Sequence, residues 1–448
     1  MPSSLKIVNA RIVGDGAIAE GDVLVRGLRI EAVGKDLSGR PAGEVIDAGG
    51  AYLLPGMIDT HVHFRQPGAE RAAEIRSESR AAVAGGITSY LEMPNTSPPT
   101  TTRARLEEKL SIAARDSMAN YAFYLGASDD NLDELLAADP RHVCGIKVFF
   151  GASTGNLVVR RQRTLEEIFR GSPLTVVAHC EDTPTIERNE ADCRSRLGGD
   201  PPLACHAEIR SAEACYLSSS RAVELARRYG TRLHILHIST ARELELLEAG
   251  APDGKLVTAE ACVHHLWFCD EDYERLGTLI KCNPAIKTRA DRDALREALA
   301  ADRIDTVSTD HAPHPMEDKR KASLAAPSGI ASVQHALPAL IDLQRRGMIS
   351  LERLVEKVCH APARLFGIED RGYVREGCFA DLVLVDPDRS QTARSRDVLH
   401  KCGWSPYTGH EFSSTVAATL VAGRVAYRDG ELDDRVRGLP LELGGRSG

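Results

Sequence analysis

The sequence predicts an α/β fold: a (β/α)8 TIM barrel with a small β-sandwich domain built from both chain termini. Two observations support this prediction. Between about residues 57 and 366, the chain alternates eight β-rich segments with helix-like segments, which is the pattern of a parallel barrel. Both ends instead hold short β-rich segments separated by glycine-containing turns. We therefore expect residues 1–56 plus 367–448 to form a composite β-sandwich domain and residues 57–366 to form the barrel.

The expected elements follow from local composition. At the termini, the β-rich segments are Leu5–Val8, Asp22–Val25, Ile30–Val33, Ala380–Pro387 and Thr415–Val421. The barrel strands are expected at Met57–His63, Ile87–Met93, Ala119–Leu125, Gly145–Phe150, Leu174–His179, Arg232–His237, Lys255–Glu260 and Ile304–Asp310. Helix-like segments lie between most of them, namely Leu106–Asp116, Leu165–Arg170, Glu208–Tyr229, Ala241–Glu248 and Asp291–Ala301.

Composition narrows the class of protein. The chain has 448 residues, of which 43% are hydrophobic, so it can bury a large core and is not expected to be disordered. Its net charge of -8 gives no electrostatic reason to bind nucleic acid or an anionic membrane. The 11 cysteines show no Cys-x-x-Cys spacing, and no apolar run approaches the length of a membrane span. We expect a soluble cytoplasmic protein with reduced thiols.

An apolar segment that starts at Leu53 leads into the motif His61-Val62-His63. Because side chains alternate along a strand, both imidazoles face the same side, where they can bind one metal ion. Arg65 falls on that side as well, and a cation beside a metal suggests a substrate with a carboxylate. The alternative is that both histidines are hydrogen-bonded loop residues, which the motif alone does not exclude.

Other expected barrel strands also end in polar residues. Lys147 lies in the fourth strand, His179 ends the fifth, His237 ends the sixth and Asp310 ends the eighth, while Asn95 follows the second. The carboxyl ends of barrel strands meet at one mouth, so these side chains would converge there with the His-x-His pair. A single such residue is more often a hydrogen-bonded core residue. Four histidines, a lysine and an aspartate from five strands instead predict a metal site, and such ligands suit zinc with an open position for water.

Five motifs together resemble the amidohydrolase superfamily and, within it, the dihydroorotase family. They are Pro55–Gly68, Met93–Thr96, Gly145–Phe149, Lys281–Pro284 and Ser308–His314. The resemblance covers almost the whole chain, and the expected flanking β sandwich is that of the larger dihydroorotases. It implies a hydrolase of cyclic amide C–N bonds. Such an enzyme reversibly closes N-carbamoyl-L-aspartate to L-dihydroorotate plus water in de novo pyrimidine (UMP) biosynthesis.

The resemblance also implies a centre of two zinc ions per subunit. Its ligands would be, for one ion, His61, His63 and Asp310, and for the other, His179 and His237. Lys147 would bridge the ions as a carboxylated lysine, because a plain ammonium between two dications is electrostatically untenable. In this mechanism a metal-bound hydroxide attacks the ring amide carbonyl next to N3, and Asp310 is the general base and then the general acid. The alternative for Lys147 is a core lysine paired with a carboxylate.

The same family pattern implies the substrate contacts. Arg65, Asn95 and His314 would hold the substrate's other carboxylate, which a guanidinium fits as a two-pronged donor. The pyrimidine ring would be contacted by Asn283 and by the backbone at Ser328 and Gly329. The alternatives are a surface salt bridge for Arg65 and a turn-forming role for Asn95.

Several further residues are expected to have structural roles. His264-His265 is expected to pack and to cap a helix rather than to support the metal ligands, and Glu260 has no assigned role. Cys144 and Cys180 are expected to be buried, inert thiols. The basic run Lys319-Arg320-Lys321 is expected on a solvated loop.

Two other functions are considered. A related cyclic amidohydrolase, either an allantoinase or a dihydropyrimidinase/hydantoinase, would share the fold, the metal ligands and the lysine. Its substrate would lack the carboxylate for which Arg65 and His314 are suited. A non-catalytic dihydroorotase-like subunit of aspartate carbamoyltransferase would have lost metal ligands, whereas every one is present here. The expected partners are the small-molecule substrate and a second copy of the chain in a homodimer, without nucleic acid or membrane.

Overall fold

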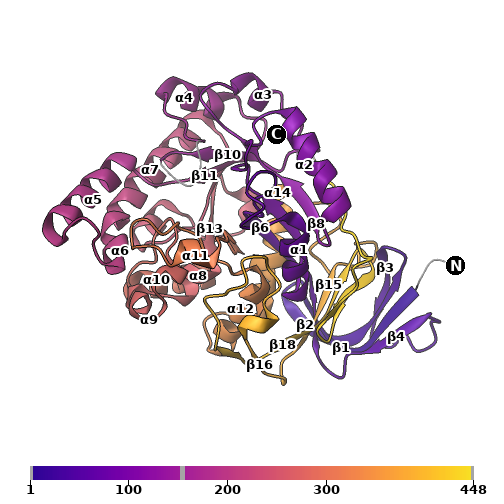
Figure 1. The fold of residues 1–448 in the computed structure, drawn as a ribbon. Coiled ribbons are helices and arrows are strands. Elements are labelled where there is room, and N and C mark those ends of the chain that lie inside the picture. The colour runs from indigo at the N-terminus through magenta and orange to yellow at the C-terminus, as the bar shows by residue number, and fades with distance from the viewer. Residues whose placement is uncertain (1–3, 152–156, 445–448) are drawn as a thin grey trace.

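The computed structural model describes residues 4–151 and 157–444. Its middle is a ring of parallel strands surrounded by helices (Figure 1). The hydrogen-bonded order is β6-β7-β8 in one sheet and β14-β13-β12-β11-β10-β9 in another. The chain runs directly from β8 into β9, and a parallel bridge between Val62 and His311 joins the end of β6 to the segment after β14. The parallel strands therefore close into a barrel.

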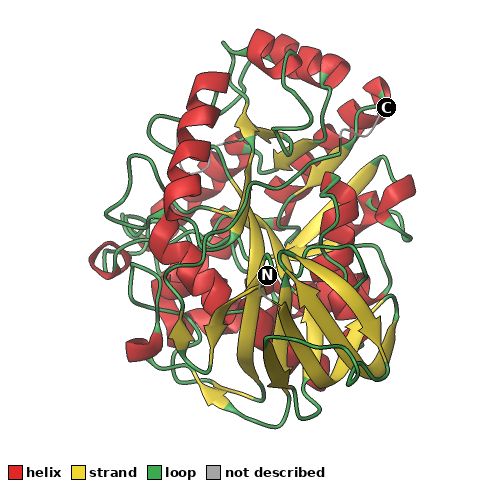
Figure 2. Ribbon diagram, turned by 90° about the vertical axis from the view of Figure 1, so that its right-hand side faces the viewer, coloured by secondary structure: helices red, strands yellow, loops and turns green. Residues whose placement is uncertain are grey.

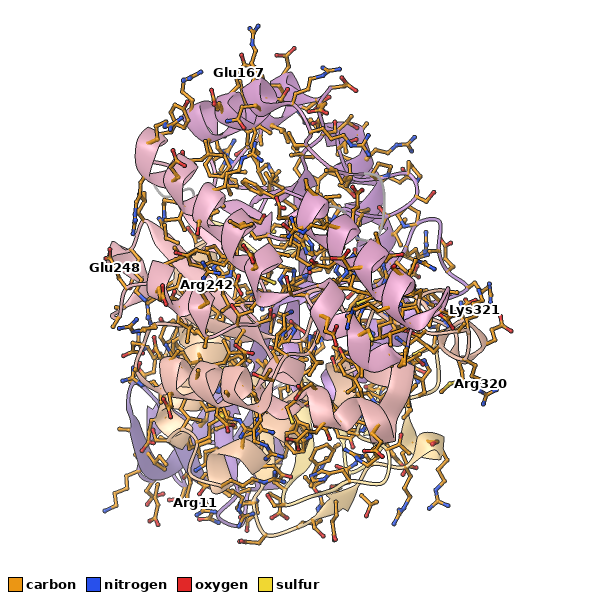
Figure 3. The ribbon with its side chains drawn as sticks, turned by 90° about the vertical axis from the view of Figure 1, so that its left-hand side faces the viewer. Arg11, Glu167, Arg242, Glu248, Arg320 and Lys321 are labelled. Carbon is orange, nitrogen blue, oxygen red and sulfur yellow. The ribbon has the colours of Figure 1, made fainter. Side chains whose placement is uncertain are left out.

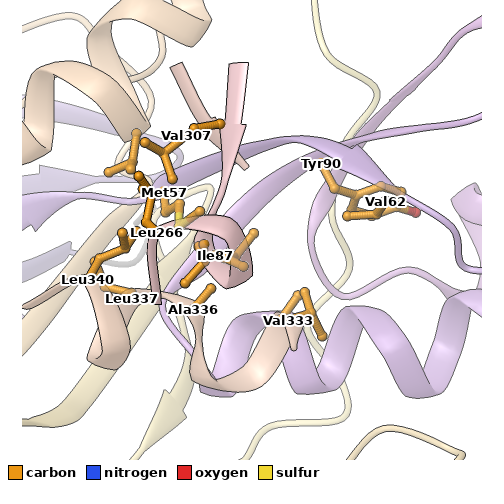
Figure 4. Packing of buried hydrophobic residues seen from close by; sticks show 14 of the residues in the cluster. Met57, Val62, Ile87, Tyr90, Leu266, Val307, Val333, Ala336, Leu337 and Leu340 are labelled. Atoms are coloured by element: carbon orange, nitrogen blue, oxygen red, sulfur yellow. The ribbon is translucent and has the colours of Figure 1, made fainter. Parts of the chain in front are cut away.

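Each barrel strand expected from the sequence overlaps an observed one. The observed strands are β6 (Met57–Val62), β7 (Ile87–Glu92), β8 (Asn120–Phe123), β9 (Leu125–Gly126), β10 (Ile146–Phe149), β11 (Val176–His179), β12 (Leu233–Ile235), β13 (Val257–Cys262) and β14 (Thr306–Ser308). Nearly all their residues are buried, which explains why these segments are apolar without a clear alternation. Met57, Ile87 and Val307 from three of the strands share one buried cluster with Leu337 and Leu340 (Figure 4).

The helices cover the outside of the barrel (Figure 1). They are α1 (Ile75–Ala84), α2 (Arg103–Asp116), α3 (Leu132–Leu136), α4 (Gln162–Gly171), α5 (Thr183–Leu197), α6 (His206–Ile209), α7 (Ala212–Tyr229), α8 (Val263–Trp267), α9 (Tyr273–Leu276), α10 (Arg289–Ala300), α11 (Met316–Lys319), α12 (Ala336–Arg345), α13 (Leu351–Val355) and α14 (Ala361–Phe366). Within the described part of the chain, none is long and apolar enough to cross a membrane.

Two helices differ from the sequence prediction. The segment expected as one helix over 208–229 divides into α6 and α7, because the Ser211 side chain accepts a hydrogen bond from the Ala214 backbone and starts a new helix. The segment expected as a helix over 241–248 contains only a 3-10 turn, Arg242–Leu246. There the Glu243 carboxylate accepts hydrogen bonds from the Ser239 backbone and the Thr240 hydroxyl, which holds the chain in a tight turn.

Both ends of the chain contribute to a nine-stranded sheet. Its order is β20-β19-β18-β15-β5-β1-β2-β3, with β4 paired to β1. In Figure 1 the indigo and the yellow strands lie side by side, and Figure 2 shows them as one broad sheet. The strands are β1 (Ser4–Gly14), β2 (Ala17–Arg26), β3 (Arg29–Gly34), β4 (Glu44–Asp47), β5 (Tyr52–Pro55), β15 (Leu382–Asp386), β18 (Thr415–Val421), β19 (Arg424–Arg428) and β20 (Glu431–Leu432), beside a separate pair of β16 (Gln391–Thr392) and β17 (Glu411–Phe412).

This sheet curls until its outer strand β3 meets the segment that leads into β15. The backbone N–H of Ile30 donates to the Cys378 carbonyl at 2.8 Å, and that of Ala380 donates to the Leu28 carbonyl at 2.9 Å. The enclosed side chains form an apolar cluster separate from that of the barrel; it includes Ile7, Val23, Leu53, Leu382 and Leu420. Because β5 leads directly into β6, the curled sheet anchors the first barrel strand, which carries the His-x-His motif.

Candidate metal centre

The carboxyl ends of the barrel strands line one cavity. Its volume is about 380 Å³, including the space at its open mouth. Of the predicted site residues, His314 alone does not line it; its ring lies behind the wall, 3.1 Å from the Ser328 carbonyl. Phe149 and Ala312 line the cavity in addition to the predicted residues. The predicted residues in its wall are His61, His63, Arg65, Asn95, Lys147, His179, His237, Asn283, Asp310, Ser328 and Gly329.

The first half of the predicted centre is a cluster of three side chains. The Nε2 atom of His61 lies 3.2 Å from Asp310 Oδ1, and the Nε2 atom of His63 lies 3.1 Å from the same oxygen. One ligand atom from each residue lies within 4.8 Å of the others. Burial lowers the pKa of His63 to about 3, so its ring is neutral, as a metal ligand requires. Burial opposes ionisation of Asp310, but the neighbouring His61 and His63 outweigh it and hold the pKa of that carboxyl well below its usual value.

The outward-facing nitrogens of these histidines are also bonded. His61 Nδ1 lies 2.9 Å from Glu260 Oε1, and Glu260 Oε2 accepts a hydrogen bond of 2.8 Å from the Thr60 hydroxyl. His63 Nδ1 lies 2.9 Å from Asn95 Oδ1. Because a carboxylate can only accept, His61 Nδ1 carries the proton, and its Nε2 lone pair faces the cavity. Both acceptors therefore orient a ligand of the first half.

The second half is a pair of histidines. His179 Nδ1 lies 3.0 Å from His237 Nε2, and His179 Nε2 lies 3.2 Å from Glu181 Oε2. Glu181 is in turn ion-paired with Arg210. Burial opposes ionisation of Glu181, but Arg210 and His179 lower the pKa of that carboxyl to about 2. The two facing imidazole nitrogens can hold one ion, but within the described ranges no carboxylate joins them in a cluster as Asp310 does in the first half.

Lys147, on β10, is almost completely buried and lines the same cavity as both halves. Within residues 4–151 and 157–444 its Nζ atom takes part in no hydrogen bond and no ion pair, and it lies 4.7 Å from the centre of the Phe149 ring. A core lysine with a structural role needs a carboxylate partner, and none of the described carboxylates forms an ion pair with Lys147. Burial lowers the pKa of Lys147 to about 8, against the opposing attraction of Asp310 and Glu260. A neutral amine is the form that reacts with CO2, so the site fits the expected modification.

The donor set therefore fits zinc: imidazole nitrogens in both halves, a carboxylate in the first, and a buried amine in the same cavity that has no ion-pair partner among the described residues.

Three of the cavity residues have left-handed backbone conformations, with φ of 66° at Arg65, 38° at His237 and 43° at Asp310. Such conformations are uncommon outside glycine and concentrate at functional sites.

Arg65 and Asn283 present unpaired groups at the cavity. Arg65 is buried; no ion pair joins it to a carboxylate of the described residues, and its Nε atom has no hydrogen-bond partner. One terminal nitrogen of Arg65 lies 3.3 Å from His314 Nε2. That same Nε2 lies 3.1 Å from the Ser328 carbonyl, to which only an N–H can bond, so it cannot also accept from Arg65. The Asn283 Oδ1 atom is likewise buried without a partner. The cavity thus offers a free guanidinium and a free amide oxygen.

The structure corrects one expectation and refines two others. Lys319 is buried rather than solvated, because its Nζ atom bonds to backbone carbonyls, while Arg320 and Lys321 reach the surface (Figure 3). His264 and His265 are buried as expected, and His265 Nε2 lies 3.1 Å from the Pro284 carbonyl, but both residues lie inside α8, whose N-cap is Cys262, so neither caps that helix. The sequence analysis assigned no role to Glu260. Its position at the end of the expected seventh barrel strand, like those of the ligands at other strand ends, could have indicated that it belongs to the site. Glu181, two residues after His179, gave no comparable signal.

Known proteins are similar along almost the whole chain. The model of the amidohydrolase family matches residues 52–148 and 208–426. A dihydroorotase from Halobacterium salinarum is 37% identical over 427 residues, which is 94% of this chain and 97% of that protein. An allantoinase from Rubrobacter xylanophilus is 35% identical over 433 residues, 95% of each. Among solved structures, an L-hydantoinase (dihydropyrimidinase) from Arthrobacter aurescens has a TM-score of 0.91 at 30% identity, covering 97% of this chain and 98% of its own.

Proposed function

The chain belongs to the amidohydrolase family, and we propose that within this family it is a dihydroorotase. It would close N-carbamoyl-L-aspartate to L-dihydroorotate plus water in pyrimidine (UMP) biosynthesis and would catalyse the reverse reaction. Similarity to relatives named dihydroorotase supports this proposal, but relatives named allantoinase are nearly as similar. The deciding observation is Arg65, a buried guanidinium at the cavity with no carboxylate of the described chain to pair with it.

Two zinc ions per subunit are the proposed cofactors. One ion would be held by His61, His63 and Asp310, and the other by His179 and His237. Carboxylated Lys147 would be a ligand of both ions. Zinc bound there would supply a Lewis acid that polarises the amide carbonyl and makes water acidic enough to attack near neutral pH.

Asp310 is the proposed proton carrier. In ring opening, the oxygen of water bonds to the ring carbonyl carbon next to N3, and the bond from that carbon to N3 breaks. Asp310 takes the proton released by the water and delivers it to N3, so that proton and electron pair end on the leaving nitrogen. Its low pKa keeps it ionised and ready to accept, and its contacts with His61 and His63 fix its position. Ring closure runs through the same steps in reverse.

Arg65 orients the substrate in this proposal. Its free guanidinium edge would pair with the carboxylate that does not react, and the Asn95 amide would add to this contact. His314 would complete the grip only after its ring turned from the Ser328 carbonyl towards the cavity. The Asn95 Oδ1 atom lies 2.9 Å from His63 Nδ1, so a contact between Asn95 and the substrate would couple substrate position to a metal ligand. The ring would contact Asn283 and the backbone at Ser328 and Gly329, which line the same cavity.

The alternatives fit less of the geometry. Allantoin, hydantoins and dihydropyrimidines lack the carboxylate that Arg65 needs, so an allantoinase or dihydropyrimidinase/hydantoinase would leave a buried cation unpaired beside its substrate. A non-catalytic subunit of aspartate carbamoyltransferase would have no use for a retained set of ligands around a cavity.

We also propose that residues 1–56 plus 367–448 act as a β-sandwich domain that supports the barrel of residues 57–366. The curled sheet and its separate apolar cluster support this division. A cytoplasmic homodimer is the proposed assembly.

The purified protein tests the proposed function directly. Zinc should be found at about two ions per chain, the number of half-sites the proposal requires. Dihydroorotate should be hydrolysed at alkaline pH, and carbamoyl aspartate should be cyclised at mildly acidic pH, because the carboxyl group that closes the ring must be protonated for its oxygen to leave as water. Absence of both reactions from zinc-loaded protein would refute the proposal.

A further inference from the structure

One wall of the cavity is a short segment, Lys281–Ala285, whose middle residue is Asn283. Four backbone carbonyls of this segment each bond to a buried side chain from outside the segment. The contacts are Lys319 Nζ to the Lys281 carbonyl at 3.4 Å, His206 Nε2 to the Cys282 carbonyl at 2.8 Å, His265 Nε2 to the Pro284 carbonyl at 3.1 Å, and Lys287 Nζ to the Ala285 carbonyl at 3.0 Å.

These backbone contacts are important because the Oδ1 atom of the Asn283 side chain makes no hydrogen bond to the described residues that would fix its orientation. Because this atom is also buried, no bond to this oxygen fixes the amide. The direction of the amide therefore depends on the backbone on either side of it. The carbonyl immediately before Asn283 belongs to Cys282, and its bond to His206 is the shortest of the four.

His206 is suited to this task by its chemistry. It lies at the start of α6, is almost fully buried, and has a pKa that burial lowers to about 3. The ring is therefore neutral at any working pH. Because a carbonyl can only accept, Nε2 must carry the proton and donate it to the Cys282 carbonyl. A buried donor of fixed protonation gives the same geometry throughout the pH range in which the enzyme works.

Lys319 connects this wall to the next one. Its Nζ atom also donates to the carbonyls of Pro327 at 3.0 Å and Gly329 at 2.9 Å, and the Gly329 N–H donates to the Lys281 carbonyl at 2.8 Å. The backbone at Gly329 is thus tied to the segment that carries Asn283. Gly329 has φ of 152°, and a Cβ there would lie 2.1 Å from the Ala312 carbonyl, so no larger residue fits this joint.

We propose that His206 is a positioning residue for substrate binding: it holds the Cys282 carbonyl and thereby aims the Asn283 amide at the bound ring. The identity of that ring rests on the proposed function, whereas the effect on the segment does not. His206 itself does not line the cavity and so acts through the backbone.

The test compares three variants with the zinc-loaded wild type. His206→Ala removes the donor, and His206→Gln retains an N–H at nearly the same distance from the backbone. His360→Ala is the matched control, because His360 is also a buried histidine, with Nδ1 2.6 Å from the Gly372 carbonyl, and does not line the cavity. The measurements are hydrogen–deuterium exchange of a peptide covering 280–286, zinc content, and kcat and KM for dihydroorotate.

His206→Ala should speed exchange of the 280–286 peptide and raise KM about tenfold, the effect expected for losing one fixed binding contact, with kcat lowered less and zinc content unchanged. His206→Gln should restore most of both effects. His360→Ala should lower the melting temperature and leave exchange of this peptide and KM unchanged. His206→Asn, whose amide is too short to reach, replaces His206→Ala if that variant does not fold.

Unchanged exchange and unchanged KM in a folded His206→Ala protein would overturn the proposal, as would equal effects in His360→Ala. If the wild type does not turn over dihydroorotate, the proposed function fails. The hydrogen–deuterium exchange of the 280–286 peptide then tests the positioning role of His206 without the kinetic data. Faster exchange in His206→Ala but not in His360→Ala then supports the positioning role, and equal exchange in both contradicts it.

Discussion

The two halves of the metal centre differ in their charge. The first half has two imidazoles and the carboxylate of Asp310, whose ligand atoms already lie within 4.8 Å of one another. The second half has two imidazoles, 3.0 Å apart, and no carboxylate of the described residues joins them in a cluster of three ligands. A dication in the second half therefore needs an anion from elsewhere, and a carboxylated Lys147 is the group positioned to supply it.

The supports behind the two halves also differ. Glu260 bonds to His61 and to the neutral hydroxyl of Thr60, and it also accepts a longer bond of 3.4 Å from the His237 backbone N–H. Among the described residues it has no arginine or lysine ion-pair partner that would offset its charge. Glu181 lies against His179 but is ion-paired with Arg210, which offsets its charge. The first half is thus anionic by itself, whereas the second half depends on a modification.

Replacing Asp310 should have the largest effect, because this residue both binds metal and carries the proton. Asp310→Asn should lower kcat about 100-fold to 10,000-fold and weaken zinc binding in the first half. Asp305→Asn is the control, since Asp305 is a buried carboxylate near the start of the same strand whose partner is Lys255, at 2.7 Å. That variant should lose stability and keep its zinc. Normal zinc content and normal kcat in Asp310→Asn would show that the charge of Asp310 is needed neither for metal binding in the first half nor for catalysis.

Lys147→Ala should empty the second half while leaving the first loaded. Zinc content should fall from about two ions to about one per chain, because two imidazoles alone are a weak site. Lys357→Ala is the control, as Lys357 is another buried lysine but is bonded to Asp302 at 2.9 Å. Zinc reconstitution of the metal-stripped wild type without CO2 should show the same loss. Two ions bound by Lys147→Ala would mean that the second half needs no added anion.

Glu260→Gln should lower the zinc affinity of the first half about 10-fold to 100-fold, the usual cost of losing the carboxylate behind a ligating histidine. The double variant Glu181→Gln/Arg210→Met removes a neutral pair and should cost the second half less. Competition with a chromogenic chelator measures both affinities. Equal losses in the two proteins would show that the Arg210 charge does not weaken the support of Glu181.

The smallest expected effect is on acid stability of the metal-free protein. Burial lowers the pKa of His63 to about 3 and that of His335 to about 4. Below about pH 6.5 the unfolded chain binds protons at these residues and the folded chain does not, so stability is lost as pH falls from about 6.5 towards 4. His335→Gln should flatten the slope of melting temperature against pH in this range. An unchanged slope would mean that His335 does not contribute.

Much of the fold and of the first layer of the site could be predicted from sequence. Barrel strands are apolar runs, and their ends bring residues such as His61 and Asp310 to one mouth whatever the details of packing. The supporting contacts could not be predicted in this way. Whether Glu260 reaches His61, or Asn95 reaches His63, depends on side-chain rotamers and on which ring nitrogen faces inward. The prediction that Lys319 is solvated was wrong. Its neighbours Arg320 and Lys321 are exposed, but Lys319 bonds to backbone carbonyls, which every residue has and which therefore leave no pattern in the sequence.

Substrate preference tests the whole account most directly. We would measure kcat/KM of the zinc-loaded protein for dihydroorotate, dihydrouracil and allantoin, in the wild type and in Arg65→Ala. The account predicts that the wild type prefers dihydroorotate. It also predicts that Arg65→Ala raises the KM for dihydroorotate at least roughly 30-fold with normal zinc content, since losing a buried charge contact costs about 2 kcal/mol or more. Faster turnover of allantoin or dihydrouracil by the wild type, or loss of zinc from Arg65→Ala, would contradict it.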